Sequence, residues 1–135
     1  MSGCSTQSST MGPQVIYTQK TTATWLVHAF SAPESTSDLG AARASVENRA
    51  SSGAMKFRAY YRTSNDGVTW DAWTSLYADG TNEQTNDGTS YGPDFVSVLN
   101  AVKGKQLIQW GVGAVNTSGP ATELATTTLK IDRKR

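Results

Sequence analysis

Alternation of apolar and polar residues predicts β-strands along most of the chain. It is clearest in residues 55–64, MKFRAYYRTS, because a strand turns successive side chains to opposite faces. One face of this strand carries Phe57, Ala59 and Tyr61, and the other carries Arg58, Tyr60 and Arg62.

The same period of two runs through residues 14–22, 106–116 and 122–132. In the last two of these stretches one face is apolar, which predicts that it packs in the core. The predicted core residues are Ile108, Trp110, Val112, Leu129 and Ile131.

Residues 65–67, Asn-Asp-Gly, predict a tight turn after the strand at 55–64, because these residues tolerate positive φ. Residues 68–76, VTWDAWTSL, are expected to return as the second strand of a hairpin. Trp70 and Trp73 are three positions apart, so a regular strand would turn them to opposite faces. One is then expected in the core. The other is exposed, covered by a loop, or redirected by a bulge.

Four further stretches are less regular. Residues 23–32 are apolar at nearly every position, which indicates a central strand covered on both faces or a buried strand of a sandwich. Residues 34–54 favour a loop with a strand near 42–50, and a short helix over 38–49 is the alternative. Residues 78–94 predict a long polar loop, and residues 95–102 a short strand or a helical turn.

Together these elements predict an all-β fold, an antiparallel β-sandwich or jelly roll. We expect a single domain over residues 14–132. Residues 1–13 carry no charge and predict a flexible N-terminal arm, either a disordered terminus or a segment that orders on a partner. Residues 133–135 predict a basic tail.

Composition narrows the range of functions. The net charge of +1 provides no overall field that would attract nucleic acid or an anionic membrane, so neither is an expected partner. No stretch approaches the roughly 18 apolar residues that a membrane span needs. The single cysteine, Cys4, cannot form an internal disulfide, and nothing before it is a leader-type apolar segment. A soluble protein made in the cytoplasm is expected.

Candidate chemistry is sparse. The one histidine, His28, lies in the most apolar stretch, where a buried, hydrogen-bonded role is favoured over a catalytic or ligating one. No motif for a nucleophile, a nucleotide or a transition metal occurs, so we expect no enzyme activity, no catalytic residue and no cofactor. The acids in residues 78–94 favour a solvated loop, with calcium binding as the alternative.

Aromatic and charged side chains supply the remaining candidates. A sugar platform needs flat, exposed aromatic rings beside polar groups, and Tyr60 between two arginines could join one with Trp73. Packing of the hairpin is favoured, because aromatic residues are preferred cross-strand partners. The candidate interface residues are Trp73, Tyr60, Arg58, Arg62, Asp79, Glu83, Asp87, Arg133 and Arg135.

Two phrases resemble known proteins. TSNDGVTWDAW, at 63–73, resembles the S-x-D-G-x-x-W strand-turn-strand phrase of β-sandwich carbohydrate-binding and phage virion domains. Residues 103–132 resemble the closing hairpin of small β-sandwich proteins from tailed-phage structural operons.

The resemblance implies a non-enzymatic virion protein of the capsid cement or decoration type. Such a protein is made in the host cytoplasm, resides in the virion, contacts capsid or other virion proteins, and is expected to form a homo-oligomer. The alternative is a carbohydrate-binding module or a phage tail adhesin domain.

Overall fold

The computed structural model describes residues 6–19, 26–49, 55–77, 84–85, 88–91, 95–116 and 122–135. In chain order the elements of this part are β1 (Thr6–Gln19), β2 (Leu26–Phe30), β3 (Glu34–Ser35), β4 (Ala41–Arg49), β5 (Met55–Ser64), β6 (Thr74–Ser75), β7 (Gln84–Thr85), β8 (Gly88–Tyr91), β9 (Val96–Ser97), α1 (Leu99–Val102), β10 (Leu107–Asn116) and β11 (Thr122–Lys134).

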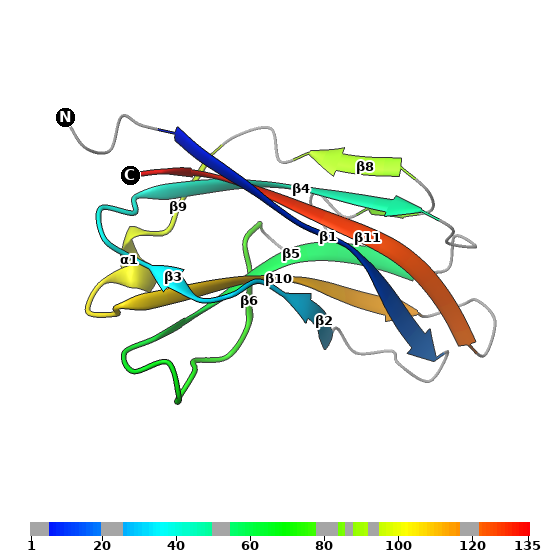
Figure 1. The fold of residues 1–135 in the computed structure, drawn as a ribbon, viewed down its shortest axis with the longest axis horizontal. Helices are drawn as coiled ribbons and strands as arrows, with labels where there is room; N and C mark the ends of the chain where they lie inside the picture. Colours follow the sequence, from blue (N-terminus) through cyan, green and yellow to red (C-terminus); the bar gives the residue numbers. More distant parts are fainter. Residues whose placement is uncertain are drawn as a thin grey trace.

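The strands form two antiparallel sheets that pack face to face (Figure 1). Sheet I has the order β1-β11-β4-β8, and β9 also pairs with β4. Sheet II has the order β2-β10-β5-β6, with β3 also on β10 and β7 also on β5. Sheet I lies above sheet II in the view of Figure 1.

Consecutive strands mostly lie in opposite sheets. Within the described part of the chain, only β5 and β6 are sequence neighbours that also pair with each other. Repeated crossing between two antiparallel sheets is the jelly-roll form of the β-sandwich. The predicted fold class is therefore confirmed.

The core lies between the sheets, where the inward faces of β4, β5, β10 and β11 meet. All five predicted core residues are buried, and Trp110 is only 1% exposed. Tyr61 faces the same interior and meets the Trp110 ring edge-on, with ring centroids 6.5 Å apart. The buried cluster comprises Ala29, Leu39, Ala42, Ala44, Val46, Phe57, Ala59, Leu76, Val98, Ile108, Trp110, Val112, Ala114, Leu129 and Ile131.

The two C-terminal strands do not form the expected hairpin. β10 pairs with β2, β3 and β5, whereas β11 pairs with β1 and β4. The link after Asn116 thus crosses from one sheet to the other. Their apolar faces still meet, because β10 and β11 face each other across the sandwich instead of side by side.

The N-terminal segment differs from the expected arm over residues 1–13. β1 begins at Thr6 and pairs with β11 over its whole length, from Thr6 opposite Lys134 to Gln19 opposite Thr122. Only a register shift between Met11 and Gln14 interrupts the pairing. Backbone hydrogen bonds need no apolar side chains, which is why a polar segment can form this strand.

Strand pairing in the structure decides the expectations for three other segments of the chain. The strand expected near 42–50 is confirmed as β4. The apolar stretch at 23–32 gives β2, which is an edge strand and not a central one, since it pairs only with β10 among the described strands. The expected loop at 78–94 contains the short strands β7 and β8.

Residues 95–102 contain both of the expected alternatives, the short strand β9 and the single-turn helix α1. No helix in the described part of the chain is long and apolar enough to cross a membrane.

Candidate functional site

The outer face of sheet II carries a cluster of three aromatic rings around one arginine. The guanidinium carbon of Arg62 lies 4.4 Å from the centroid of the Trp73 ring and 4.8 Å from that of Trp70. It also lies 5.4 Å from the Phe30 ring, which in turn is 5.9 Å from Trp73. We call Phe30, Arg62, Trp70 and Trp73 the Arg62 cluster.

Strand alternation explains why the cluster faces outward. Phe57 and Ala59 of β5 are in the core, so Arg62 and the other even-numbered residues of this strand turn to the opposite face. Phe30 joins from β2, where it lies opposite Gly111 of β10. Half of the Phe30 side chain, 50%, is exposed.

Two glycines of β10 make room for the rings on this face. A Cβ atom on Gly111 would lie 3.2 Å from Cη2 of Trp73 and 2.8 Å from Cγ1 of Val27. A Cβ atom on Gly113 would lie 2.4 Å from Cε2 of Tyr60, closer than real contacts allow. The glycines thus let the Trp73 and Tyr60 rings lie directly against the strand.

Arg62 is held in place by the three rings and by a hydrogen bond to Gln109. Its Nε donates a hydrogen bond of 2.8 Å to Oε1 of Gln109, the residue opposite it on β10. The Gln109 amide nitrogen donates in turn to the carbonyl of Ser31, at 2.7 Å. The side-chain amide is therefore fixed at both ends, and the guanidinium has a defined position between the rings.

Trp70 and Trp73 do not divide between core and surface as expected. Both contact Arg62 on the outer face, and neither belongs to the buried core cluster. The cause is local, because residues 71–73 are irregular and strand alternation does not apply to them. The chain does reverse after β5, with Gly67 at a φ of 77°. The strand expected over 68–76 is reduced to β6 (Thr74–Ser75) and an isolated bridge between Ser64 and Trp70.

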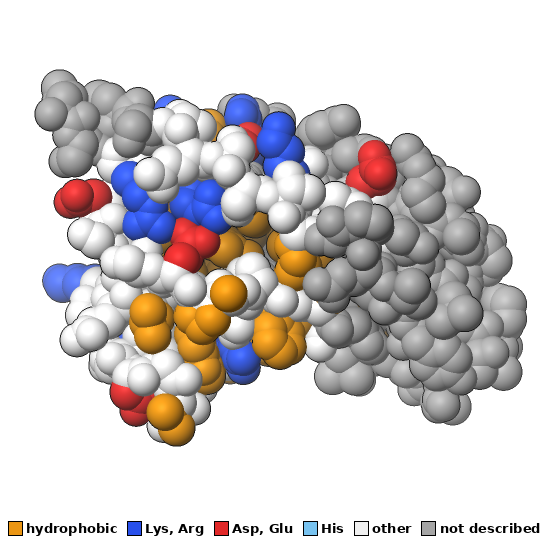
Figure 2. Space-filling model, in the orientation of Figure 1, with side chains coloured by type: hydrophobic (Ala, Val, Ile, Leu, Met, Phe, Trp, Pro, Cys, Tyr) orange, Lys and Arg blue, Asp and Glu red, His pale blue; other side chains and the backbone are white. Residues whose placement is uncertain are grey.

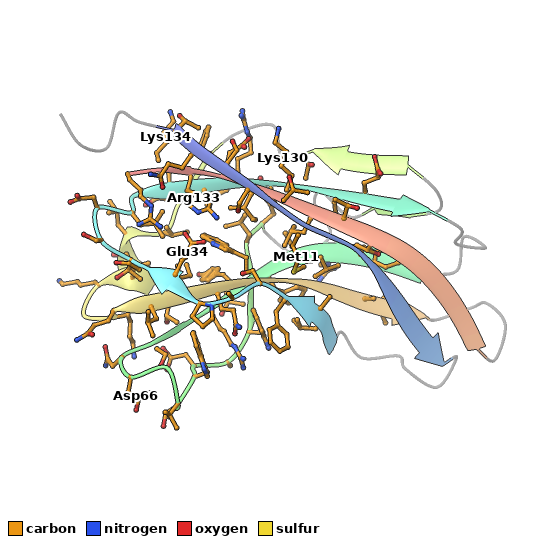
Figure 3. All side chains as sticks on the ribbon, in the orientation of Figure 1. Met11, Glu34, Asp66, Lys130, Arg133 and Lys134 are labelled. Carbon is orange, nitrogen blue, oxygen red and sulfur yellow. The ribbon has the colours of Figure 1, made fainter. Side chains whose placement is uncertain are left out.

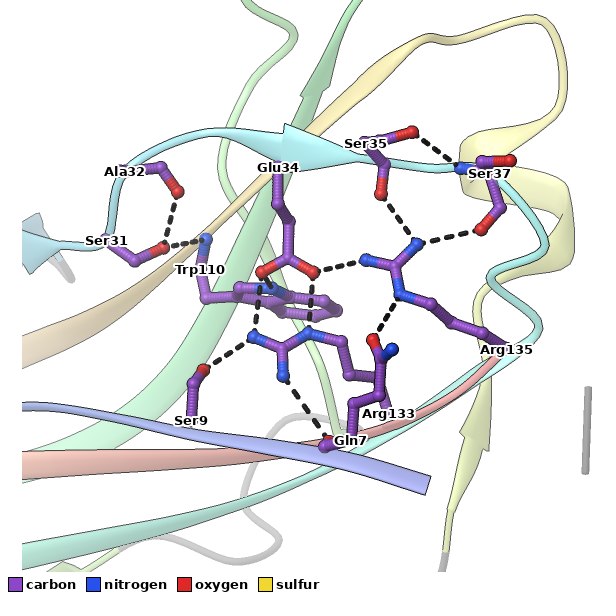
Figure 4. Close-up of polar contacts among 10 residues, drawn as sticks. All are labelled: Gln7, Ser9, Ser31, Ala32, Glu34, Ser35, Ser37, Trp110, Arg133 and Arg135. Carbon is purple, nitrogen blue, oxygen red and sulfur yellow. Dashed lines mark hydrogen bonds and ion pairs between the residues drawn. The ribbon is translucent and has the colours of Figure 1, made fainter. Parts of the chain in front are cut away.

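A second polar cluster lies between the sheets at the end of the sandwich where the described part of β1 begins (Figure 3). Glu34 of β3 binds Arg133 of β11 through two hydrogen bonds, Nε to Oε2 at 2.6 Å and Nη2 to Oε1 at 2.8 Å. Its Oε1 also accepts from Nε1 of Trp110 at 2.9 Å, and its Oε2 from Nη2 of Arg135 at 2.6 Å. We call these residues the Glu34 clamp (Figure 4).

The clamp joins the two sheets. β3 belongs to sheet II, while β11 and its partner β1 belong to sheet I. Arg133 also donates to Ser9 Oγ at 2.6 Å, and Arg135 donates to the carbonyls of Ser35 and Ser37 at 2.8 Å each. Residues 133–135 are therefore not a free basic tail, and Arg133 is only 6% exposed.

The outer face of sheet I carries a smaller charged group. Asp132 accepts from Arg43 Nη2 at 3.0 Å and from Ser8 Oγ at 2.6 Å. Burial alone would raise the pKa of Asp132, but these hydrogen bonds outweigh burial and lower it. Lys130 and Lys134 project from the same face (Figure 3), and the Lys134 ammonium lies 4.5 Å from the Phe95 ring centroid.

Two aspartates, Asp66 and Asp71, stabilise the loop after β5 through hydrogen bonds and an ion pair. Hydrogen bonds from the backbone of Thr69 and Val68 lower the pKa of Asp66, which lies at the tip of the turn (Figure 3). A bond from Lys105, followed by one from Thr63, lowers the pKa of Asp71. Both acids thus have structural partners.

The surface formed by the described residues includes two hollows. One of about 430 Å³ lies between β1 and the β2–β3 edge, where Figure 2 shows hydrophobic side chains gathered below a charged group. It is lined by Ser9, Thr10, Met11, Ser31, Ala32, Pro33, Glu34, Trp110, Leu129, Ile131 and Arg133. The other, about 590 Å³, is lined by Ser35, Thr36, Ser37, Asn65, Asp66, Lys105, Gln106 and Leu107.

The candidate interface residues separate into three groups. Trp73, Tyr60, Arg58 and Arg62 share the outer face of sheet II. Arg133 and Arg135 belong to the Glu34 clamp. Asp79, Glu83 and Asp87 lie outside the described residues, as does the side chain of His28.

Sequence reasoning missed Glu34, Gln109, Phe30 and the two β10 glycines. Only the glycines left a signal, since glycine inside a strand marks a close approach of another group. In the described part of the chain, no three His, Cys, Asp or Glu side chains gather as a metal site would require.

Comparison with known proteins identifies the architecture. No protein-family model and no curated protein matches the sequence. Solved structures do match in fold, among them the VP2 subviral particle of infectious bursal disease virus, with a TM-score of 0.56 and 11% identity. The shared fold is the jelly-roll sandwich.

The matched region is nearly all of this chain, 96%, but 33% of the viral chain. Derived T=1 particles of the same virus match at a TM-score of 0.56 and 11% identity over 96% and 32% of the two chains. The structure of the Gx strain of infectious bursal disease virus matches with a TM-score of 0.53 and 9% identity. The match covers 94% of this chain and 32% of the viral chain. This chain thus spans about a third of those proteins' length, and identity this low shows the fold alone.

Proposed function

We propose that this protein is a non-enzymatic virion structural protein, a capsid cement or decoration protein that binds neighbouring virion proteins through the outer face of sheet II. The observation that carries the proposal is the Arg62 cluster. Tryptophan and arginine are enriched among the residues that dominate protein–protein binding, where they combine apolar area with hydrogen-bond donors. Here they lie on an outer face beside the half-exposed Phe30.

The comparisons support this proposal through the fold. The solved structures that share the jelly roll include a subviral particle and T=1 particles of infectious bursal disease virus. The sequence resemblance to small virion proteins of tailed phages supports the same role. We propose that the protein resides in the virion and contacts capsid proteins as a homo-oligomer.

The test is sedimentation of particles purified from the native host. The wild-type protein should sediment with the shells at a fixed ratio. The Phe30→Ser variant should remain in the soluble fraction while unfolding at nearly the wild-type midpoint, because half of the Phe30 side chain is already exposed. Lys130→Gln, on the outer face of the other sheet, is the matched control and should still sediment. A wild-type protein found only in the soluble fraction would contradict the proposal.

A glycan-binding module or adhesin domain is the second candidate, and the exposure of Phe30 favours it. Against it, the Trp73 ring already lies against Arg62, Phe30 and the β10 backbone at Gly111, whereas stacking of a sugar needs an open ring face. A glycan array probed with the wild-type protein decides between the two. Binding that Trp73→Ala abolishes would favour the adhesin.

A further inference from the structure

We infer that the Arg62 cluster binds a carboxylate side chain flanked by an apolar residue, presented by an extended segment of a partner protein. The inference rests on the proposed function, since it names the chemistry of the partner that the outer face of sheet II would contact.

The first step is the charge of this face. Its described outward positions on β5 include Lys56 and Arg62, and those on β2, β6 and β10 include no Asp or Glu. Arg62 forms no ion pair with any described acid; its contacts there are Gln109 and the three rings. The face is therefore complementary to an acidic partner.

The second step is the geometry of Arg62. The Nε–H group of Arg62 donates to Gln109, so the Nη1 and Nη2 groups remain as donors for a ligand. Two parallel N–H groups of a planar guanidinium match the two oxygens of a carboxylate. Because the rings and Gln109 already order the side chain, binding would lose little further rotamer freedom.

The third step selects the partner class. Single-stranded nucleic acid binds aromatic surfaces by stacking bases on open ring faces, and sugars need the same faces. The two tryptophan rings are instead engaged with Arg62 at 4.4 Å and 4.8 Å. An apolar side chain needs no open face and can pack on the exposed half of Phe30, so a peptide segment fits best.

The experiment selects a random linear peptide library on the immobilised full-length protein. The enriched peptides should contain Asp or Glu next to an apolar residue. A synthetic enriched peptide should bind about tenfold more tightly than its Glu→Gln or Asp→Asn form, as expected for one good charge-assisted pair. Its affinity should fall with added salt, because the pair is only partly buried.

Protein variants then locate the site. Arg62→Gln should weaken binding of that peptide about tenfold, and Arg62→Lys should weaken it less, because lysine keeps the charge but not the planar fork. Phe30→Ser should also weaken binding. Lys130→Gln, a loss of one positive charge on the outer face of sheet I, should leave affinity unchanged. Unfolding midpoints of all variants are measured alongside. If Arg62→Gln fails to fold, the loss of binding in Phe30→Ser tests the site instead.

Several results would overturn the inference. These are enriched peptides without acids, no enrichment at all, or binding that is indifferent to both Arg62→Gln and Phe30→Ser. Arg62-dependent binding of oligothymidylate or of acidic glycans in place of peptides would also overturn it. Particle sedimentation is measured separately, so sedimenting protein with no acid-dependent peptide binding would reject this inference and leave the proposed function intact.

Discussion

The Glu34 clamp gives the sharpest test of how the two sheets are held together. Changing Glu34 to Gln keeps the shape of the side chain and the acceptor for Trp110, but it removes the negative charge. The new amide group would also point N–H donors at guanidinium donors. Arg133, whose side chain is 7% exposed, would then be a buried cation without a counter-ion.

The cost follows from the burial of the pair. Breaking a buried ion pair by removing one partner costs about 3–5 kcal/mol, since the remaining charge stays desolvated. The Glu34 side chain is 23% exposed, so water offsets part of that cost. We expect a loss in the free energy of unfolding of about 3 kcal/mol, at the low end of the range.

Urea denaturation at neutral pH, followed by tryptophan fluorescence, measures the loss. A control is Lys105→Gln, which breaks the ion pair with Asp71; because the Asp71 side chain left behind is 55% exposed, this change should cost much less. The double change Glu34→Gln with Arg133→Met removes both buried charges, and it should be less destabilising than Glu34→Gln alone. A Glu34→Gln loss no larger than that of the control would refute the reasoning.

Three further predictions follow from the packing and the charges. Trp110→Ala should lower the free energy of unfolding by about 3–5 kcal/mol, as expected for a fully buried large-to-small change; an unchanged urea midpoint would show that Trp110 is not core. Gly113→Ala should cost about 1–3 kcal/mol by thermal denaturation, because the new methyl overlaps the Tyr60 ring at 2.4 Å. Gly40→Ala, whose nearest contacts would be at 3.9 Å, should cost less, and equal losses would remove the steric explanation. Because the fold lowers the pKa of Asp132, its stabilisation is complete above the unfolded value of about 3.9 and is lost as pH falls through the folded pKa. Asp132→Asn should therefore reduce the fall in unfolding midpoint at acidic pH, and parallel curves for the two proteins would contradict this.

The sequence by itself determined the class of fold and the apolar faces of β10 and β11 that lie in the core. Alternation with a period of two depends only on which residues are apolar, so it placed Ile108, Trp110, Val112, Leu129 and Ile131 in the interior. The turn at 65–67 was equally local, because its conformation follows from the residues in it. It also joins β5 and β6, the one pair of sequence-neighbouring strands in the described part of the chain that pair with each other.

Only the tertiary structure decided which strands pair and which distant residues meet. β10 and β11 are similar in pattern whether they pair side by side or face each other across the core, since both arrangements bury the same apolar faces. The strand predicted over residues 14–22 is the second half of β1, but its first half, from Thr6, is mostly polar and forms because its backbone pairs with β11, which leaves no trace in side-chain hydrophobicity. The clamp brings Glu34 to Arg133 across 99 positions of sequence, and the Arg62 cluster joins β2, β5 and an irregular loop. Such contacts are set by how the sheets stack, so no local pattern in the sequence could predict them.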